Sequence, residues 1–166
     1  DATWALDGPR VDKLAALAET LAPAGPRYRY RFLFTDRDHD LHDGEGDFSA
    51  QELRLASRRQ AAVEELHAAE GPSGIIAMAR MVESPWKLGV ALGHLASVDY
   101  DPHLLPGELG SVESTVEQFL AGYVRARYLR HGIPWLQALN IGPWPREPRQ
   151  RILTWLPFHE PVWAFV

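Results

Sequence analysis

Cysteine is absent from the 166-residue sequence. Its absence excludes a disulfide framework, a thiolate metal site and a thiol nucleophile. Lysine occurs only at Lys13 and Lys87, so arginine supplies nearly all of the basic charge, a bias typical of GC-rich bacterial genomes. No apolar run approaches the roughly 18 residues that a membrane span requires. The sequence therefore predicts a bacterial protein that has no disulfides and does not insert into a membrane.

Motifs of familiar catalytic chemistry are also missing. The chain contains no Gly-x-Ser-x-Gly nucleophile elbow, no Walker phosphate loop and no dinucleotide-binding glycine fingerprint. It also lacks the His-Glu-x-x-His pattern of helical zinc sites. We therefore predict that the chain is not an enzyme, has no catalytic residues and uses no cofactor.

The overall composition is that of one globular domain. Hydrophobic residues make up 46% of the chain and charged residues 23%, so the chain can bury a core. The formal net charge of -5 disfavours general binding to nucleic acid or to membrane surfaces, but it does not exclude a local basic patch. We interpret residues 1–166 as a single helical domain. Because the last predicted helix has no stop signal before Val166, we also expect a fragment of a longer chain.

Apolar residues recur at three- and four-residue steps along most of the sequence, which is the period of amphipathic helices. Proline and glycine separate these stretches. Residues 27–34 instead alternate polar and aromatic side chains, the period of a strand, but no second run offers a ladder partner, so we favour a helix. Helices are predicted over 11–21, 27–34, 49–70, 73–82, 84–97, from 111 or 114 to 131, over 134–139, 146–156 and from 160 onward.

The order of these segments predicts an all-α fold of antiparallel helical pairs. A solenoid-like array of the TPR or HEAT kind and an irregular helical bundle give the same pattern, so both arrangements stay open. Residues 84–97 are apolar on most of the helix circumference and are expected at the centre of the domain. Gly89 and Gly93 indicate a small-residue face for close helix packing. Ser49 and Glu52 have the spacing of a capping box at the start of a long surface helix.

An acidic segment precedes this long helix. Residues 36–52 hold seven acidic side chains and one arginine and carry -6, whereas the rest of the chain sums to about +1. With Glu52 at the twelfth position of a calcium loop, Gly46 falls at the sixth, but Leu41 at the first cannot coordinate a cation. Imidazole and carboxylate groups in the same stretch suit zinc or nickel instead. We favour a solvated acidic loop and keep a metal site in residues 36–47 as the alternative, with the candidate ligands Asp36, Asp38, His39, Asp40, His42, Asp43 and Glu45.

Basic and aromatic residues interleave in the C-terminal third of the chain. Arginine can contact phosphates while aromatic rings stack on bases, so this mixture also occurs in proteins that bind single-stranded nucleic acid. Trp155, however, shares an apolar stripe with Ile152 and Leu156, which indicates a core position, and arginines near helix ends complement the helix dipole. Nucleic-acid binding is therefore a second, disfavoured alternative. Its candidate residues are Arg125, Arg127, Arg130, Arg146, Arg149 and Arg151, interleaved with Tyr128, Trp135, Trp144 and Trp155.

Four stretches are distinctive: Arg-Tyr-Arg-Phe-Leu-Phe (29–34), Arg-Arg-Gln-Ala-Ala-Val (58–63), Val-Glu-Ser-Pro-Trp-Lys-Leu-Gly (82–89) and the ending from 150 to 166. Together they resemble helical-repeat (α-solenoid) regions of large bacterial multidomain proteins, which carry an effector or nucleotide-hydrolysing module elsewhere. The resemblance implies an α-solenoid fragment without activity of its own that serves as a scaffold or sensor and contributes no site residues. The partners then expected are another protein or other domains of the parent chain, in the cytoplasm, without membrane or nucleic acid.

Overall fold

The computed structural model describes residues 7–21, 25–41, 47–95, 99–111 and 113–163. Within these ranges the regular structure is entirely helical, without a strand, so the predicted all-α class is confirmed. None of the helices found there combines the length and the apolar character needed to cross a membrane. The elements in chain order, with η for a 3₁₀ helix, are α1 (Gly8–Leu21), α2 (Pro26–Tyr30), η1 (Arg31–Phe34), η2 (Asp38–Leu41), α3 (Phe48–Ala79), α4 (Pro85–Gly93), α5 (Asp101–Leu104), η3 (Gly107–Gly110), α6 (Ser114–Ala138), α7 (Arg146–Thr154) and α8 (Glu160–Trp163).

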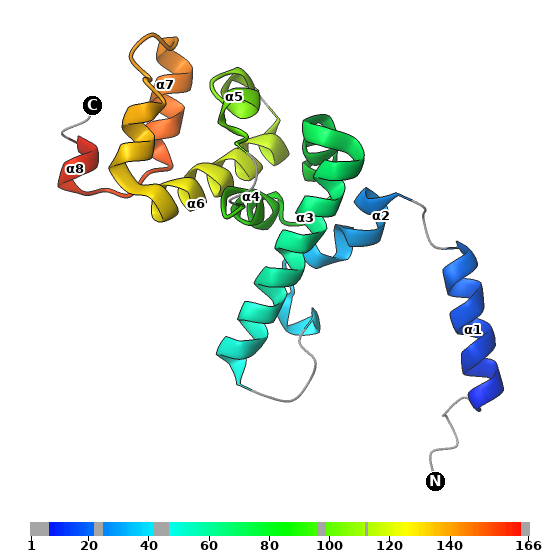
Figure 1. Cartoon of the computed structure of the whole chain (residues 1–166). Coiled ribbons are helices and arrows are strands. Elements are labelled where there is room, and N and C mark those ends of the chain that lie inside the picture. Colours follow the sequence, from blue (N-terminus) through cyan, green and yellow to red (C-terminus); the bar gives the residue numbers. More distant parts are fainter. Residues whose placement is uncertain (1–6, 22–24, 42–46, 96–98, 112, 164–166) are drawn as a thin grey trace.

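Helix α4 lies at the centre of the fold, between α3 and α6, and packs along α6 more extensively than any other pair of elements (Figure 1). Leu88 and Leu92 of α4 are buried, as the apolar character of residues 84–97 predicts. The largest fully buried side chains around them are Tyr100, Tyr123 and Phe119, with Phe34 from η1 on the side of α3. The short central helix therefore joins the two long helices into one core.

Glycine lets the backbones of α4 and α6 touch. A Cβ atom on Gly89 would lie 1.9 Å from the carbonyl oxygen of Phe119, and one on Gly122 would lie 2.2 Å from the carbonyl oxygen of Trp86. A Cβ atom on Gly93 would also lie 2.7 Å from its nearest neighbour on α6. Since no side chain fits at these separations, the predicted small-residue packing face is confirmed.

The two long helices each change direction at a glycine. Gly71 in α3 has φ 65° and ψ -163°, and Gly132 in α6 has φ 65° and ψ -154°. Glycine adopts this left-handed φ region without the steric cost that a Cβ atom imposes. Pro72 and Pro134 follow at the start of the next helical turn, where a missing N–H costs little. The sequence predicts that helices end at Gly71 and Gly132. The structure confirms a break in the helix at each glycine, although the chain continues as a helix on the other side.

The sequence predictions for the two helical segments at 26–34 and after residue 47 have different outcomes. Residues 26–34 are helical, as favoured, and Leu33 and Phe34 are buried.

The predicted capping box is wrong, because α3 begins at Phe48 and its N-cap is Asp47, whose carboxylate accepts a hydrogen bond from the Ser49 N–H at 3.3 Å. A carboxylate caps a helix well and is favoured at the positive end of the helix dipole, so Asp47 takes the place expected of Ser49.

Helix α1 has an apolar face that is not covered. The predicted helix over residues 11–21 is confirmed, but none of its residues is buried. Val11, Leu14, Leu17 and Leu21 are between 49% and 72% exposed. Because α1 stands apart from the other helices (Figure 1), the core described above is built without it.

Candidate functional site

The acidic segment contributes one structural ion-pair cluster. The carboxylate of Asp38 lies 2.5 Å from Nη2 of Arg59 and 2.8 Å from Nζ of Lys87. Arg59 is buried, and its Nε–H also donates to the carbonyl oxygen of Leu33 at 2.7 Å. Asp38 therefore joins η2 to α3 and α4. Its carboxylate is already neutralised by two cationic side chains, whereas a metal ligand would need that negative charge for the metal ion.

The other described candidates of this segment do not gather around a common point. His39 pairs with its neighbour Asp40, both being well exposed, and the Asp36 N–H donates to Glu83. In the part of the chain that the structure describes, no three His, Asp or Glu side chains lie close enough together to hold a metal ion. His42, Asp43 and Glu45 lie outside the described residues, so the metal site that includes them stays a prediction.

The Asp38 cluster makes part of the stability pH-dependent. Burial by itself would raise the pKa of Asp38, but hydrogen bonds from Arg59 and Lys87 outweigh it and hold the pKa below its ordinary value. A carboxyl whose pKa is lower in the folded state stabilises the fold above its unfolded pKa of about 3.9, and this contribution is lost as the pH falls below it.

We therefore expect Asp38→Asn to reduce the free energy of unfolding by a constant amount between neutral pH and about pH 5, and by less below about pH 4. Urea unfolding of the two proteins at a series of pH values measures this difference. Asp40→Asn is the control, because the Asp40 carboxylate is exposed and its loss should change stability little. A difference between Asp38→Asn and the parent protein that persists undiminished to pH 3 would contradict the ion-pair interpretation.

Three of the predicted nucleic-acid residues bind within the fold. Arg127 lies 3.2 Å from the buried carboxylate of Asp101. Arg130 donates to the carbonyl oxygen of His94 at the end of α4, at 2.5 Å. Arg151 donates to the carbonyl oxygen of Ser111 at 2.7 Å and also pairs with Glu147. These guanidinium groups position α6 and α7 against their neighbours, and each is bonded within the fold.

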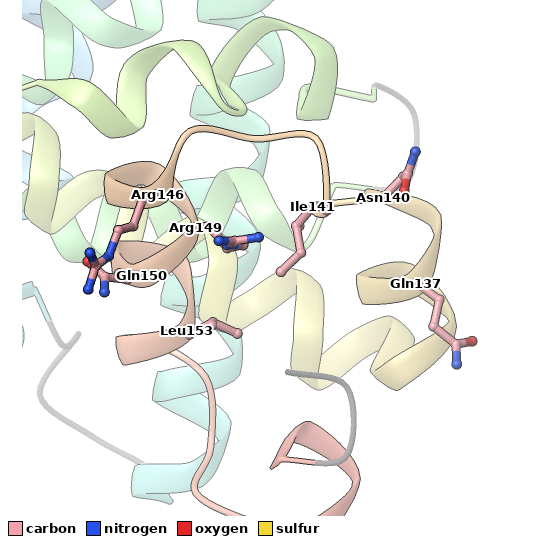
Figure 2. Close-up of a pocket in the computed structure, with 8 residues that line it drawn as sticks. Gln137, Asn140, Ile141, Arg146, Arg149, Gln150 and Leu153 are labelled. Carbon is pink, nitrogen blue, oxygen red and sulfur yellow. The ribbon is translucent and has the colours of Figure 1, made fainter.

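Arg146 and Arg149 have a different environment, because both line a pocket between the C-terminal end of α6 and α7. Arg125 is half-buried on α6 and does not line it. The pocket has a volume of about 640 Å³. Figure 2 shows Arg149 directed toward Ile141 across the pocket, whereas Arg146 and Gln150 project from the other side of α7. The complete lining is Gln137, Asn140, Ile141, Gly142, Arg146, Arg149, Gln150 and Leu153.

The turn after α6 forms one wall of this pocket. Asn140 has φ 45°, and its N–H donates to the carbonyl oxygen of Gln137 at 3.1 Å. Asparagine tolerates this left-handed backbone better than most residues with a Cβ atom. The chain consequently leaves α6 in a tight turn and returns along α7, which places the arginines of α7 beside the end of α6.

The pocket suits an anionic group. Arg146 and Arg149 are exposed and have no ion-pair partner among the described residues, while Glu147 on the same helix is paired with Arg151. Three carboxamides add neutral donors and acceptors, and Ile141 and Leu153 provide an apolar surface. Guanidinium groups bind carboxylates and phosphates through paired N–H donors, so this lining can hold carboxylates flanked by apolar side chains.

The aromatic residues of the same region are not displayed for stacking on bases. Tyr128 and Trp135 are buried, and their polar atoms are bonded to His159 at 2.7 Å and to Asp101 at 2.6 Å. Trp144 and Trp155 are partly buried and pack against the core. The core position expected of Trp155 is thus confirmed. Among the described residues, the lining of the pocket contains arginines but no aromatic side chain on which a base could stack.

Sequence reasoning missed the residues that complete the pocket and the carboxylate that holds Arg127. Asn140 and Gly142 directly after a helix were a usable signal for a tight turn. No signal marked Asp101, because its partners Tyr123, Arg127 and Trp135 lie 22 to 34 residues away in the sequence.

The fold and this pocket define an all-α protein with an arginine-lined surface site. Comparison of the chain with protein families, with curated proteins and with solved structures finds no match. The function is therefore argued from the chemistry of the described residues.

Proposed function

We propose that the chain is a non-catalytic helical-repeat module of a larger cytoplasmic bacterial protein, and that it binds an acidic segment of a partner protein in the pocket between α6 and α7. The observation that carries the proposal concerns two exposed arginines of the lining, Arg149, which points toward Ile141, and Arg146 on the other side of α7. Neither has an acidic partner within the described residues. A short peptide with two or three carboxylates and an apolar side chain matches the lining in both charge and apolar surface.

A correspondence between two parts of the fold supports the helical-repeat interpretation. Gly132 lies 61 residues after Gly71 with nearly the same φ and ψ, and α7 begins 61 residues after α4, each being nine residues long. Two pairs of buried residues follow the same spacing, namely Ile75 with Leu136 and Leu95 with Leu156. A long helix, a glycine break and a short returning helix therefore occur twice, which is the construction of stacked helical pairs.

Hydrogen bonds between side chains extend this correspondence. His67 near the end of the first part of α3 bonds to Tyr100, and Tyr128, 61 residues after His67, bonds to His159. In each unit an aromatic–imidazole pair ties the long helix to the chain that follows the short helix. The two units have few identical residues at equivalent positions. Their similarity lies in the glycine breaks, the buried positions and the aromatic–imidazole hydrogen bonds.

The features of the pocket favour a protein over a nucleic acid as the partner. Proteins that hold single strands combine several phosphate contacts with aromatic stacking. Here two arginines are available, the nearby aromatic side chains are packed into the fold, and the chain carries a net charge of -5. An acidic peptide requires no stacking platform and no extended basic track.

The proposal is tested with a fluorescein-labelled deca-glutamate peptide, whose binding is followed by fluorescence anisotropy. We expect saturable binding that weakens roughly tenfold or more in the double variant Arg146→Glu/Arg149→Glu, because charged hydrogen bonds become repulsive contacts. The matched control is Arg54→Glu/Arg58→Glu, which changes the net charge equally at exposed positions of α3 and should bind nearly as the parent protein does.

A labelled single-stranded decanucleotide serves as the competing probe under the same conditions. If the nucleotide bound more tightly than the peptide and this binding were lost in the pocket variant, the partner would be a nucleic acid and the proposal of a protein partner would be wrong. If peptide binding fell equally in the pocket variant and in the α3 control, the net charge of the protein would explain the binding, and the proposed site would be refuted. Circular dichroism of both variants confirms that the helices are retained.

A further inference from the structure

A second cavity also borders the end of α6 and the turn that follows it, with Leu139 and Trp144 in its lining. It has a volume of about 290 Å³. Its walls combine two carboxylates with two indole rings, and no guanidinium or ammonium group is part of its lining. The lining residues are Asp99, Asp101, Pro102, Leu105, Trp135, Ala138, Leu139 and Trp144. We name it the indole pocket.

The carboxylates of the indole pocket differ in their bonding. Asp101 is buried and accepts hydrogen bonds from the Tyr123 hydroxyl at 2.6 Å and from Trp135 Nε1 at 2.6 Å, besides its ion pair with Arg127. Asp99 is 64% exposed and lies 3.6 Å from Arg127. One guanidinium thus faces two carboxylates, which leaves one surplus negative charge in the lining, and Asp99 is the more exposed of the two.

The aromatic wall is partly fixed in orientation. The bond from Trp135 Nε1 to Asp101 holds this indole, which is 7% exposed, in the wall of the cavity. Trp144 is partly buried and packs against the core at the turn before α7. Indole faces attract cations through the ring quadrupole, and Pro102, Leu105 and Leu139 complete an apolar wall.

We propose that the indole pocket binds an organic ammonium ion attached to apolar carbon groups, either the end of a lysine side chain from a peptide or a free quaternary ammonium compound. The cavity is large enough for such a group, and its surplus carboxylate charge repels anions. A bare metal ion fits less well, because both oxygens of Asp101 already accept hydrogen bonds and the remaining wall is apolar. This proposal does not depend on the arginine-lined pocket, whose lining is separate.

The experiment is an NMR titration of the whole chain that follows the indole N–H signals of Trp135 and Trp144, the latter assigned with Trp144→Phe. The probes are choline, its uncharged carbon isostere 3,3-dimethyl-1-butanol, and N-acetyl-lysine methylamide. We expect saturable shifts with the charged probes and at least roughly fivefold weaker binding of the isostere. Asp99→Asn should weaken the charged probes to a similar extent, while Glu117→Gln, which removes one charge from an exposed position of α6, should not.

The outcomes are distinct. Tighter binding of the lysine derivative than of choline supports the proposal with a peptide as the source of the cation, and the reverse order supports it with a free ammonium compound. Equal binding of choline and its isostere would overturn it in favour of a plain apolar cavity. Absence of saturable shifts at the two indoles, or an unchanged affinity in Asp99→Asn, would also overturn it.

Discussion

The variant Gly89→Ala is expected to lose at least about 2 kcal/mol of unfolding free energy, although alanine is the better helix former. The new methyl group would lie 1.9 Å from the carbonyl oxygen of Phe119 and 2.8 Å from the amide nitrogen of Tyr123. Both atoms belong to the backbone of α6, so no side-chain rotation can relieve the overlap and the two helices must move apart. The displacement opens the core around Leu88 and Leu92, which are buried by the same contact.

Urea unfolding followed by circular dichroism measures this loss. Gly107→Ala is the matched control, because a Cβ atom at Gly107 meets nothing within 4 Å, so stability should change by less than about 0.5 kcal/mol. Gly122→Ala should resemble Gly89→Ala, since its methyl group would collide with the backbone of Trp86. If Gly89→Ala unfolded at the same urea concentration as the parent protein, direct backbone contact between α4 and α6 would be refuted.

The second large effect is expected at Asp101. This buried carboxylate accepts from Tyr123 and Trp135 and is paired with Arg127, whose side chain is 13% exposed. Burial, together with the adjacent Asp101 carboxylate, raises the pKa of Tyr123 well above its ordinary value, so the phenol stays protonated and remains a donor. Asp101→Ala leaves two donors and one largely buried cation without their acceptor, and we expect a loss of about 3 kcal/mol.

Single variants divide this effect among the partners of Asp101. Tyr123→Phe removes one neutral donor and should cost about 1 kcal/mol. Asp99→Ala removes the other, exposed carboxylate near Arg127 and should cost less than about 1 kcal/mol. Thermal unfolding of the three variants checks the order. If Asp101→Ala were no less stable than Asp99→Ala, the network would not contribute to the fold.

Much of the helical structure was predictable because its causes are local. Gly71 and Gly132 break the long helices where glycine punctuates an apolar period, and Pro85 marks the start of α4. The small-residue face at Gly89 and Gly93 was also recognisable from its spacing. The cap of α3 was missed because two good capping residues, Asp47 and Ser49, lie two positions apart and only geometry selects between them.

The candidate site was predicted only in part. The arginines of the C-terminal third looked equivalent in the sequence, yet Arg127, Arg130 and Arg151 are engaged within the fold while Arg146 and Arg149 line a pocket. What separates them is the position of distant acceptors, and such positions depend on how α4, α6 and α7 pack. In the same way, the sequence offered Asp38 only as one of seven alternative metal ligands in an acidic loop, and nothing nearby in the chain marked its two basic partners on α3 and α4.

The sequence by itself determined the helices and their breaks, because periodicity, glycine, proline and caps act within a few residues along the chain. It also determined that α4 would be central, since its composition leaves it almost no polar face. Only the tertiary structure decided which charges are neutralised inside the fold and which line a pocket. Electrostatic partners act over a few ångströms in space regardless of their separation along the chain, and packing alone sets those distances.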